Sequence, residues 1–159
     1  MPEHHPIDAK DWYSVYGAPR NSLQHLGSIT IEELAILLSQ RTVGKDFLVI
    51  DVRRADCTSM IPGAVNIPAH SLPVSLAPLL PLLSHIPLIV FHCSRSAGRA
   101  PRAAGWYADA LQTQEMHTSE EIKKRVVILQ GGIVRWEEIF GAGDLHKRGQ
   151  KEGMRTTQL

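Results

Sequence analysis

A cysteine and an arginine that could together attack and hold an oxyanion lie six positions apart, at Cys93 and Arg99. The residues between them are Ser94, Arg95, Ser96, Ala97 and Gly98. Most of these are small, so the backbone can curl until successive N–H groups point at one anion, and Gly98 can adopt a positive φ in the turn. Arg99 can hold two oxygens with its planar fork of donors. We expect the same positive field to stabilise a thiolate at Cys93, which makes Cys93 the candidate nucleophile and Arg99 its catalytic partner.

Short apolar runs predict the strands that must position this loop. The runs cover residues 47–50, 88–91 and 126–129, with a weaker candidate at 64–68. Continuous apolar runs of this length are typical of strands buried on both faces of a parallel sheet. The run at 88–91 leads directly into Cys93, so we expect the loop at the carboxyl end of a buried strand, where α/β folds bind their ligands.

Helices are predicted between these runs. Thr30 and Glu33 form the capping signature of a first helix. Another helix is expected to begin between residues 98 and 101, directly after the loop, and a short one to cover residues 133–140. The leucine-rich segment 72–85 contains two internal prolines, which we expect to shorten or kink its helix. Strands that alternate with helices indicate an α/β domain with a mostly parallel sheet.

The whole chain of 159 residues has the composition of one globular domain, with 43% hydrophobic and 21% charged residues. A net charge of +1 predicts no nucleic-acid partner, and no apolar stretch is long enough for a membrane span. Two cysteines exclude a disulfide framework, and the histidines show no metal-ligand spacing, so no metal is expected. Without a signal-peptide pattern we expect a cytoplasmic protein, with the nucleus as the alternative. Residues 1–27 are interpreted as an N-terminal arm, 28–140 as the catalytic domain and 141–159 as a loose C-terminal tail.

The loop resembles the Cys-(X)5-Arg signature of cysteine-based phosphatases, and the sequence around it resembles a rhodanese domain. Residues 49–53 and 61–68 are similar to the first half of that domain, and residues 129–136 are similar to the Gly-Gly-x-x-x-Trp helix start near its end. The resemblance covers about residues 28–140. It implies a single rhodanese-like domain, with a mostly parallel five-stranded sheet and helices on both faces. In this resemblance the Gly-Gly pair specifies the fold only.

The loop length and composition narrow the activity that the resemblance implies. Five residues between Cys93 and Arg99 are typical of the cell-division-cycle dual-specificity phosphatases and the related eukaryotic arsenate reductases, whereas rhodanese sulfurtransferases have one residue fewer. The cell-cycle phosphatases carry a carboxylate next to the cysteine, where this chain has Ser94 and Arg95. A general acid contributes ~10²–10⁴-fold to ester cleavage, and arsenate reduction does not depend on one in the loop. The resemblance therefore favours a thiol-dependent arsenate reductase, with no bound cofactor and with glutathione or a glutaredoxin as the external reductant.

Three other functions stay open. A protein tyrosine or dual-specificity phosphatase would act on a phosphoprotein through a phosphocysteine intermediate, and Asp56 on the neighbouring loop is the nearest candidate general acid. A thiosulfate-type sulfurtransferase is disfavoured by the loop length. A non-enzymatic rhodanese-like binding module is disfavoured because it has no need of an intact Cys93 and Arg99.

Residues outside the loop could support its chemistry. Asp51 and Arg53 are expected to pair with each other or with loop amides. His92 either tunes the thiolate through hydrogen bonds or is a satisfied buried histidine. Cys57 is either the second thiol of arsenate reduction or an ordinary half-buried cysteine. Within the loop, Arg95 lies either on the rim of the pocket or in solvent.

Overall fold

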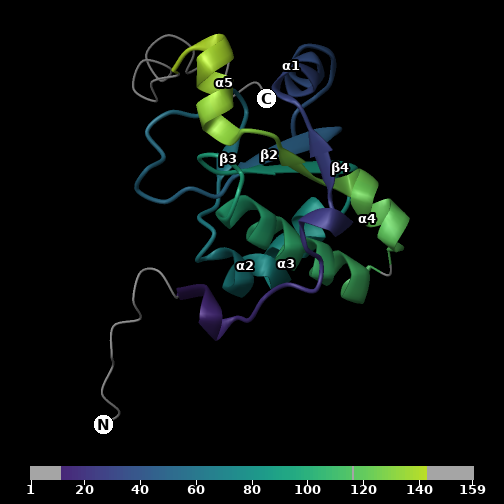
Figure 1. Ribbon diagram of the computed structural model, residues 1–159. Helices are drawn as coiled ribbons and strands as arrows, with labels where there is room; N and C mark the ends of the chain where they lie inside the picture. Colours follow the sequence, from purple (N-terminus) through teal and green to yellow (C-terminus); the bar gives the residue numbers. More distant parts are fainter. Residues whose placement is uncertain (1–11, 116, 143–159) are drawn as a thin grey trace.

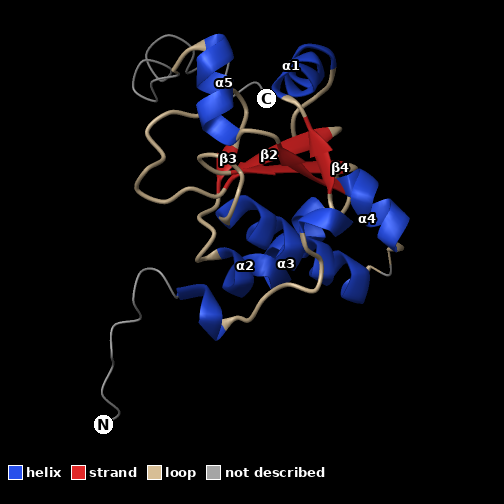
Figure 2. Ribbon diagram, in the orientation of Figure 1, coloured by secondary structure: helices blue, strands red, loops and turns tan. Residues whose placement is uncertain are grey.

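A five-stranded, all-parallel sheet forms the centre of the computed structural model, which describes residues 12–115 and 117–142 (Figures 1 and 2). Its strands run in the order β1-β5-β4-β2-β3. They are β1 (Gly27–Ile29), β2 (Phe47–Asp51), β3 (Val65–Asn66), β4 (Leu88–His92) and β5 (Val126–Leu129). All residues of β2 and β5 are buried, as expected for apolar runs with helices on both sides. The predicted α/β class and five-stranded sheet are confirmed.

Helices cover both faces of the sheet (Figure 2). On one face lie α1 (Ile31–Gln40) and α5 (Gly132–Phe140), whose apolar side chains form one core cluster with the strands. On the other face lie α2 (Leu72–Leu83) and α3 (Arg99–Gln114), with α4 (Ser119–Arg125) beside them, and these form the second cluster. Within the part of the chain that the structure describes, no helix is both long and apolar enough to cross a membrane.

The helix starts follow local sequence signals. The Thr30 hydroxyl accepts from the Glu33 amide at 3.1 Å, and the Glu33 carboxylate accepts from the Thr30 amide at 2.9 Å, as the predicted capping box requires. A second capping box, of Thr118 and Glu121, starts α4. This helix was not predicted, although the same signature is present in its sequence.

The leucine-rich segment was expected to form a shortened or kinked helix, and its helix is not shortened. Helix α2 continues for twelve residues with Pro78 and Pro81 inside it, and so it is not cut short. An internal proline costs about 3 kcal/mol of helix stability. Burial of a leucine side chain contributes about 1.5–3 kcal/mol, and Leu72, Leu80 and Leu83 of this helix are all buried. Tertiary packing therefore offsets the local cost.

The segment before β1 packs on α3. It contains two short 3₁₀ helices, η1 (Trp12–Val15) and η2 (Leu23–His25). The Arg102 guanidinium lies 3.6 Å from the centre of the Tyr13 ring, and the Tyr16 and Trp106 rings are 6.1 Å apart. Residues 1–11 of the predicted arm and residues 143–159 of the predicted tail lie outside the described residues.

Candidate active site at the carboxyl end of β4

The candidate nucleophile lies at the centre of the sheet edge where the parallel strands end. Cys93 directly follows β4, which lies between β5 and β2, and its side chain is only 3% exposed. The register of β2 and β4 pairs Asp51 with His92. The residues that follow these two strands, Arg53 and Cys93, are therefore brought to the same edge, although 40 positions separate them in the sequence.

The loop from Cys93 to Arg99 leaves its backbone donors available. No amide of residues 94–98 donates a hydrogen bond to any other described residue. The positive φ of this loop is at Ser96, with a value of 58°, and not at Gly98, whose φ of −133° corrects the prediction. A non-glycine residue in this region carries backbone strain, and such strain is concentrated at functional sites. The Ser96 hydroxyl is also buried without a hydrogen-bond partner among the described residues.

The start of α5 holds the loop from behind. The amides of Ile133 and Val134 donate to the carbonyl oxygens of Cys93 and Ser94, both at 3.1 Å. Gly132 makes this approach possible, because a Cβ there would lie 2.6 Å from the Cys93 oxygen and 2.5 Å from the Ser94 oxygen. Sequence reasoning gave the Gly-Gly pair a role in the fold only, and the structure adds a direct contact with the loop. The contact joins segments that lie far apart in the sequence, so no local sequence pattern predicts it.

Arg99 makes a two-point ion pair with Asp56. Its Nη1 donates to Oδ1 at 2.9 Å and its Nη2 to Oδ2 at 2.7 Å. The hydrogen bonds from Arg99 lower the pKa of Asp56 to about 2. The same bonds, together with the nearby Cys93, raise the pKa of Arg99. At neutral pH both partners of this pair are therefore charged.

A buried polar cluster lies beside the loop, at the end of β2. Arg53 donates to both oxygens of Asp51, at 2.8–3.1 Å, so the expected pairing of these two residues is present. Burial alone would raise the pKa of Asp51, but the hydrogen bonds from Arg53 and the neighbouring His92 hold it below its usual range. Cys57 Sγ lies 3.5 Å from Asp51 Oδ2, and burial and this carboxylate raise the pKa of the Cys57 thiol. Cys57 is therefore a protonated thiol at neutral pH, and both cysteines are free.

His92 is completely buried between this cluster and the nucleophile. Its Nδ1 lies 3.1 Å from the Cys93 carbonyl oxygen, which can only accept, so Nδ1 carries the proton. Its Nε2 has no hydrogen-bond partner among the described residues and lies 3.8 Å from Asp51 Oδ2. Burial lowers the pKa of His92, so the ring is neutral at pH 7.

The chain has a match among known protein families. The family of rhodanese-like domains matches residues 30–139, which is more than half of the chain. The protein belongs to the rhodanese-like domain family. This confirms the family that the sequence resembles, while the roles of the individual site residues stay predictions.

Several solved structures resemble this rhodanese-like domain. Ygr203w of Saccharomyces cerevisiae, a homolog of single-domain rhodanese and of the Cdc25 phosphatase catalytic domain, is 23% identical, with a TM-score of 0.59 over 77% of this chain and 87% of that chain. The As-Sb reductase from Leishmania major is 27% identical, with a TM-score of 0.58 over 73% and 79%. RPA3614 from Rhodopseudomonas palustris, a possible tyrosine phosphatase, is 18% identical, with a TM-score of 0.56 over 91% and 99%. The first and third likenesses concern the fold alone. A comparison with curated proteins found no match.

The other predicted site residues are placed as follows. Arg95 is exposed, with no hydrogen bond to another described residue, and Ser94 is half-buried. Ala97 and Gly98 are exposed on the loop. Two contacts were not predicted: Arg53 donates to the Ser59 carbonyl oxygen, and the Ser59 hydroxyl donates to Glu137 of α5. They connect the 54–61 loop to the helix that holds Cys93, a long-range link that carries no sequence signature.

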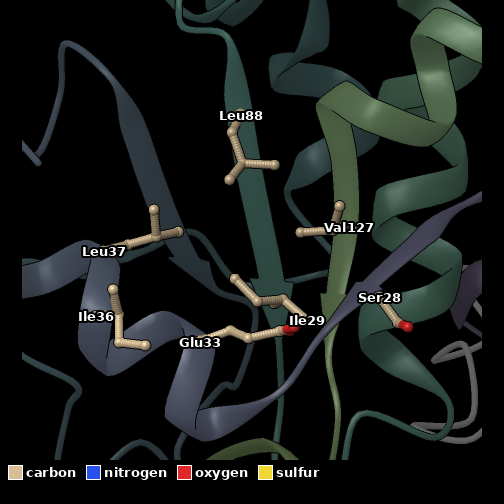
Figure 3. A pocket seen from close by; sticks show the side chains of 7 residues that line it. All are labelled: Ser28, Ile29, Glu33, Ile36, Leu37, Leu88 and Val127. Atoms are coloured by element: carbon tan, nitrogen blue, oxygen red, sulfur yellow. The ribbon is translucent and has the colours of Figure 1, made fainter.

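Two pockets of the rhodanese-like domain have no residue of the Cys93 loop in their lining. One, of about 340 Å³, lies between α1 and the sheet and is lined by Ser28, Ile29, Glu33, Ile36, Leu37, Leu88 and Val127 (Figure 3). Leu88 begins β4, so this apolar pocket is at the opposite end of the strand from Cys93. The other, of about 350 Å³, lies between the starts of α1 and α5. Among residues 12–115 and 117–142, no group of acidic, histidine or cysteine side chains is arranged to hold a metal ion.

Proposed function

We propose that this rhodanese-like protein is a thiol-dependent arsenate reductase, in which Cys93 is the nucleophile and Arg99 holds the oxyanion. One observation carries the proposal: the five consecutive amides of residues 94–98, which donate to no other described residue, lie between the buried cysteine and the guanidinium. Backbone amides and a guanidinium are the donors that a tetrahedral oxyanion requires. The 27% identity to an As-Sb reductase supports the same class of reaction.

The proposed reaction balances with two external thiols. Cys93 Sγ forms a bond to arsenic, the As–O bond to one arsenate hydroxyl breaks, and this hydroxyl leaves as water with a proton taken from solvent. A glutathione thiol then attacks Cys93 Sγ, the S–As bond breaks, and its electron pair stays on arsenic, which leaves as arsenite. A second glutathione, or a glutaredoxin, reduces the mixed disulfide and restores Cys93. One arsenate and two thiols thus yield one arsenite, one disulfide and one water. Burial and Asp51 raise the pKa of the Cys57 thiol, which reduces its thiolate fraction below that of an ordinary thiol and favours an external reductant over Cys57.

The state of Asp56 favours the reductase over a phosphatase. A phosphatase gains from a proton donor at the leaving oxygen. Asp56, the nearest candidate, is paired with Arg99 and has a pKa of about 2, so at neutral pH it has no proton to donate. The loss of water in arsenate reduction does not depend on this carboxyl group. Asp56 as a general acid therefore stays a prediction that the ion pair disfavours.

The first experiment compares wild type with Cys93→Ser on two substrates, arsenate with glutathione and glutaredoxin, and an aryl phosphate. We expect arsenate turnover that disappears in Cys93→Ser, with little phosphatase activity in either protein. Circular dichroism checks that the variant is folded. Strong Cys93-dependent phosphatase activity without arsenate turnover would replace the reductase with the phosphatase. Absence of both activities would refute both, and thiosulfate would then test sulfur transfer against a binding module.

A further inference from the structure

We propose that Asp56 is a positioning residue for Arg99: its carboxylate holds the Nη1–Nη2 edge of the guanidinium so that the adjacent Nε–Nη2 edge is presented to the oxyanion. This inference rests on the proposed function only in naming Arg99 as the oxyanion ligand. It gives Asp56 a role other than proton donation.

The geometry of the Asp56–Arg99 pair leaves the other N–H donors of the guanidinium available to a ligand. A guanidinium has five N–H donors in a rigid plane, and Asp56 accepts one from Nη1 and one from Nη2, which together form the end of the fork. The Nε donor and the second Nη2 donor form a parallel pair on the side of the fork. No described residue accepts a hydrogen bond from Arg99 Nε. This side pair matches two oxygens of a tetrahedral anion in the bidentate way that Arg binds phosphate.

The guanidinium of Arg99 is close to the candidate nucleophile. Arg99 is near enough to Cys93 for that side chain to raise the pKa of the guanidinium, in addition to the effect of Asp56. Arg99 also begins α3, directly after the loop whose amides are available. A guanidinium fixed at its Nη1–Nη2 edge by Asp56 can therefore contribute its remaining donors to the same anion as the loop amides.

Asp56 itself is held in place by the buried cluster. Arg53, which is bound to the buried Asp51, donates from Nη1 to the Asp56 carbonyl oxygen at 3.2 Å. The Arg54 amide donates to Asp56 Oδ1 at 3.1 Å. The residues at the end of β2 therefore fix the backbone of Asp56. Asp56 in turn fixes the guanidinium of Arg99, which lies 43 positions later in the sequence.

Because the Asp56–Arg99 pair is partly exposed, its effect on anion binding can be measured separately from any effect on folding stability. The side chains of Arg99 and Asp56 are 28% and 47% exposed. Ion pairs as exposed as this contribute little to the free energy of unfolding. Loss of the Asp56 charge should therefore leave the protein folded and change mainly how Arg99 binds the anion.

The test measures binding of inorganic phosphate, a non-reducible probe, by calorimetry, together with arsenate kcat and KM. The variants are Asp56→Asn, which keeps the shape and removes the charge, and Asp56→Glu, which keeps the charge. Glu138→Gln is the matched control, because it removes an exposed carboxylate from the pair with Arg135 on α5. We expect Asp56→Asn to weaken phosphate binding and lower kcat/KM by about two- to fivefold, the upper part of the range of a partly exposed ion pair. Asp56→Glu should recover part of this loss, and Glu138→Gln should behave as wild type.

A double-mutant cycle with Arg99→Lys shows whether Asp56 acts through Arg99. If it does, Asp56→Asn has little further effect once Arg99 is lysine, whereas an independent structural effect would add to the first. Tighter phosphate binding by Asp56→Asn would overturn the inference and make Asp56 a competitor of the anion, and unchanged binding would overturn it as well. Arg99-dependent phosphate binding without arsenate turnover would instead refute the reductase and leave the positioning role standing. If wild type bound no phosphate, the inference would be wrong too.

Discussion

His92 directly precedes Cys93, the candidate nucleophile, and is the residue of the buried cluster whose protonation state is clearest. Its Nδ1 faces the Cys93 carbonyl oxygen at 3.1 Å, and its Nε2 faces Asp51 at 3.8 Å. Asp51 is in turn held by Arg53. Burial lowers the pKa of His92 more than the Asp51 charge raises it, so the folded protein keeps the ring neutral below the pH at which a free histidine is protonated.

This neutral ring predicts that stability falls with acidification. Below about pH 6.5 the unfolded chain binds a proton on this histidine and the folded protein does not. The free energy of unfolding should therefore decrease as pH falls from 7.5 to 5.5, by up to about 1.4 kcal/mol per pH unit from this one group. Urea unfolding at pH 7.5, 6.5 and 5.5 measures the slope.

His92→Asn should flatten that slope, while His85→Asn, at an exposed position, should keep it. Asp51 does not interfere, because its lowered pKa makes its own contribution to stability disappear only at more acidic pH. Stability that rises on acidification, or an equal slope in both variants, would contradict the neutral buried ring.

At the scale of elements, α5 holds the Cys93 loop in place and also covers one face of the sheet. Its first amides bind the carbonyl oxygens of Cys93 and Ser94. Ser59 binds Glu137 on the same helix, which ties the loop that carries Asp56 to α5. One helix therefore contacts both loops of the candidate site, so its start and the Cys93 loop should respond together to substitution.

Gly132→Ala tests this support. The added Cβ meets the Cys93 and Ser94 oxygens at 2.6 Å and 2.5 Å, and Gly132 has a φ of 60°. Gly44 has a φ of 83° with no atom near its would-be Cβ, so Gly44→Ala measures the cost of the backbone conformation alone. We expect Gly132→Ala to lose about 1–3 kcal/mol more stability than Gly44→Ala, the usual cost of overpacking.

Gly132→Ala and Gly44→Ala should also differ in arsenate turnover. Gly132→Ala should lose most activity because the loop must move, while Gly44→Ala should keep it. Thermal unfolding and turnover at a temperature where both variants are folded provide the two measurements. Equal turnover in the two variants would show that the loop does not depend on the start of α5.

At the scale of the whole molecule, the segment before β1 packs across α3 and so enlarges the domain. Asp109 accepts hydrogen bonds from the amides of Arg20 and Asn21, at 2.7 Å and 2.9 Å, and from the Asn21 side chain at 2.7 Å. Gly105 allows the close approach, because a Cβ there would lie 2.3 Å from the Asn21 carbonyl oxygen. The contacts of Arg20 and Asn21 lie at Gly105 and Asp109 in the middle of α3, whereas the candidate site lies at the start of that helix.

Asp109→Ala should release this segment without loss of catalysis. The variant removes the acceptor of the Asn21 amide and of one bond from the Asn21 side chain, while the bond from Asn21 Nδ2 to Gln112 Oε1 remains. The unpaired buried amide should cost about 1–3 kcal/mol of stability. Limited trypsin digestion should cut after Arg20 faster than in wild type, while arsenate turnover stays at the wild-type rate. Gln114→Ala, at an exposed position of the same helix, serves as the control. An unchanged cleavage rate, or a loss of turnover, would show that the segment is held or used differently.

Local patterns in the sequence were sufficient for much of the fold. The apolar runs at residues 47–50, 88–91 and 126–129 became buried strands, because a strand covered on both faces has no polar position to fill. The Thr30 capping box started a helix for an equally local reason. The proline-containing α2 shows the limit of such patterns, since burial of its leucines decided its length.

The sequence by itself determined which strand leads into Cys93 and that Arg99 follows at the distance of one loop, because both facts depend on neighbouring residues. Only the tertiary structure decided that Asp56 holds Arg99, that the strained residue is Ser96 and not Gly98, and that Gly132 lies against the Cys93 carbonyl oxygen. These contacts join segments about 40 residues apart, or depend on how the loop is held by them. The parallel register brings such segments to one edge of the sheet, and no local pattern encodes which side chains then meet.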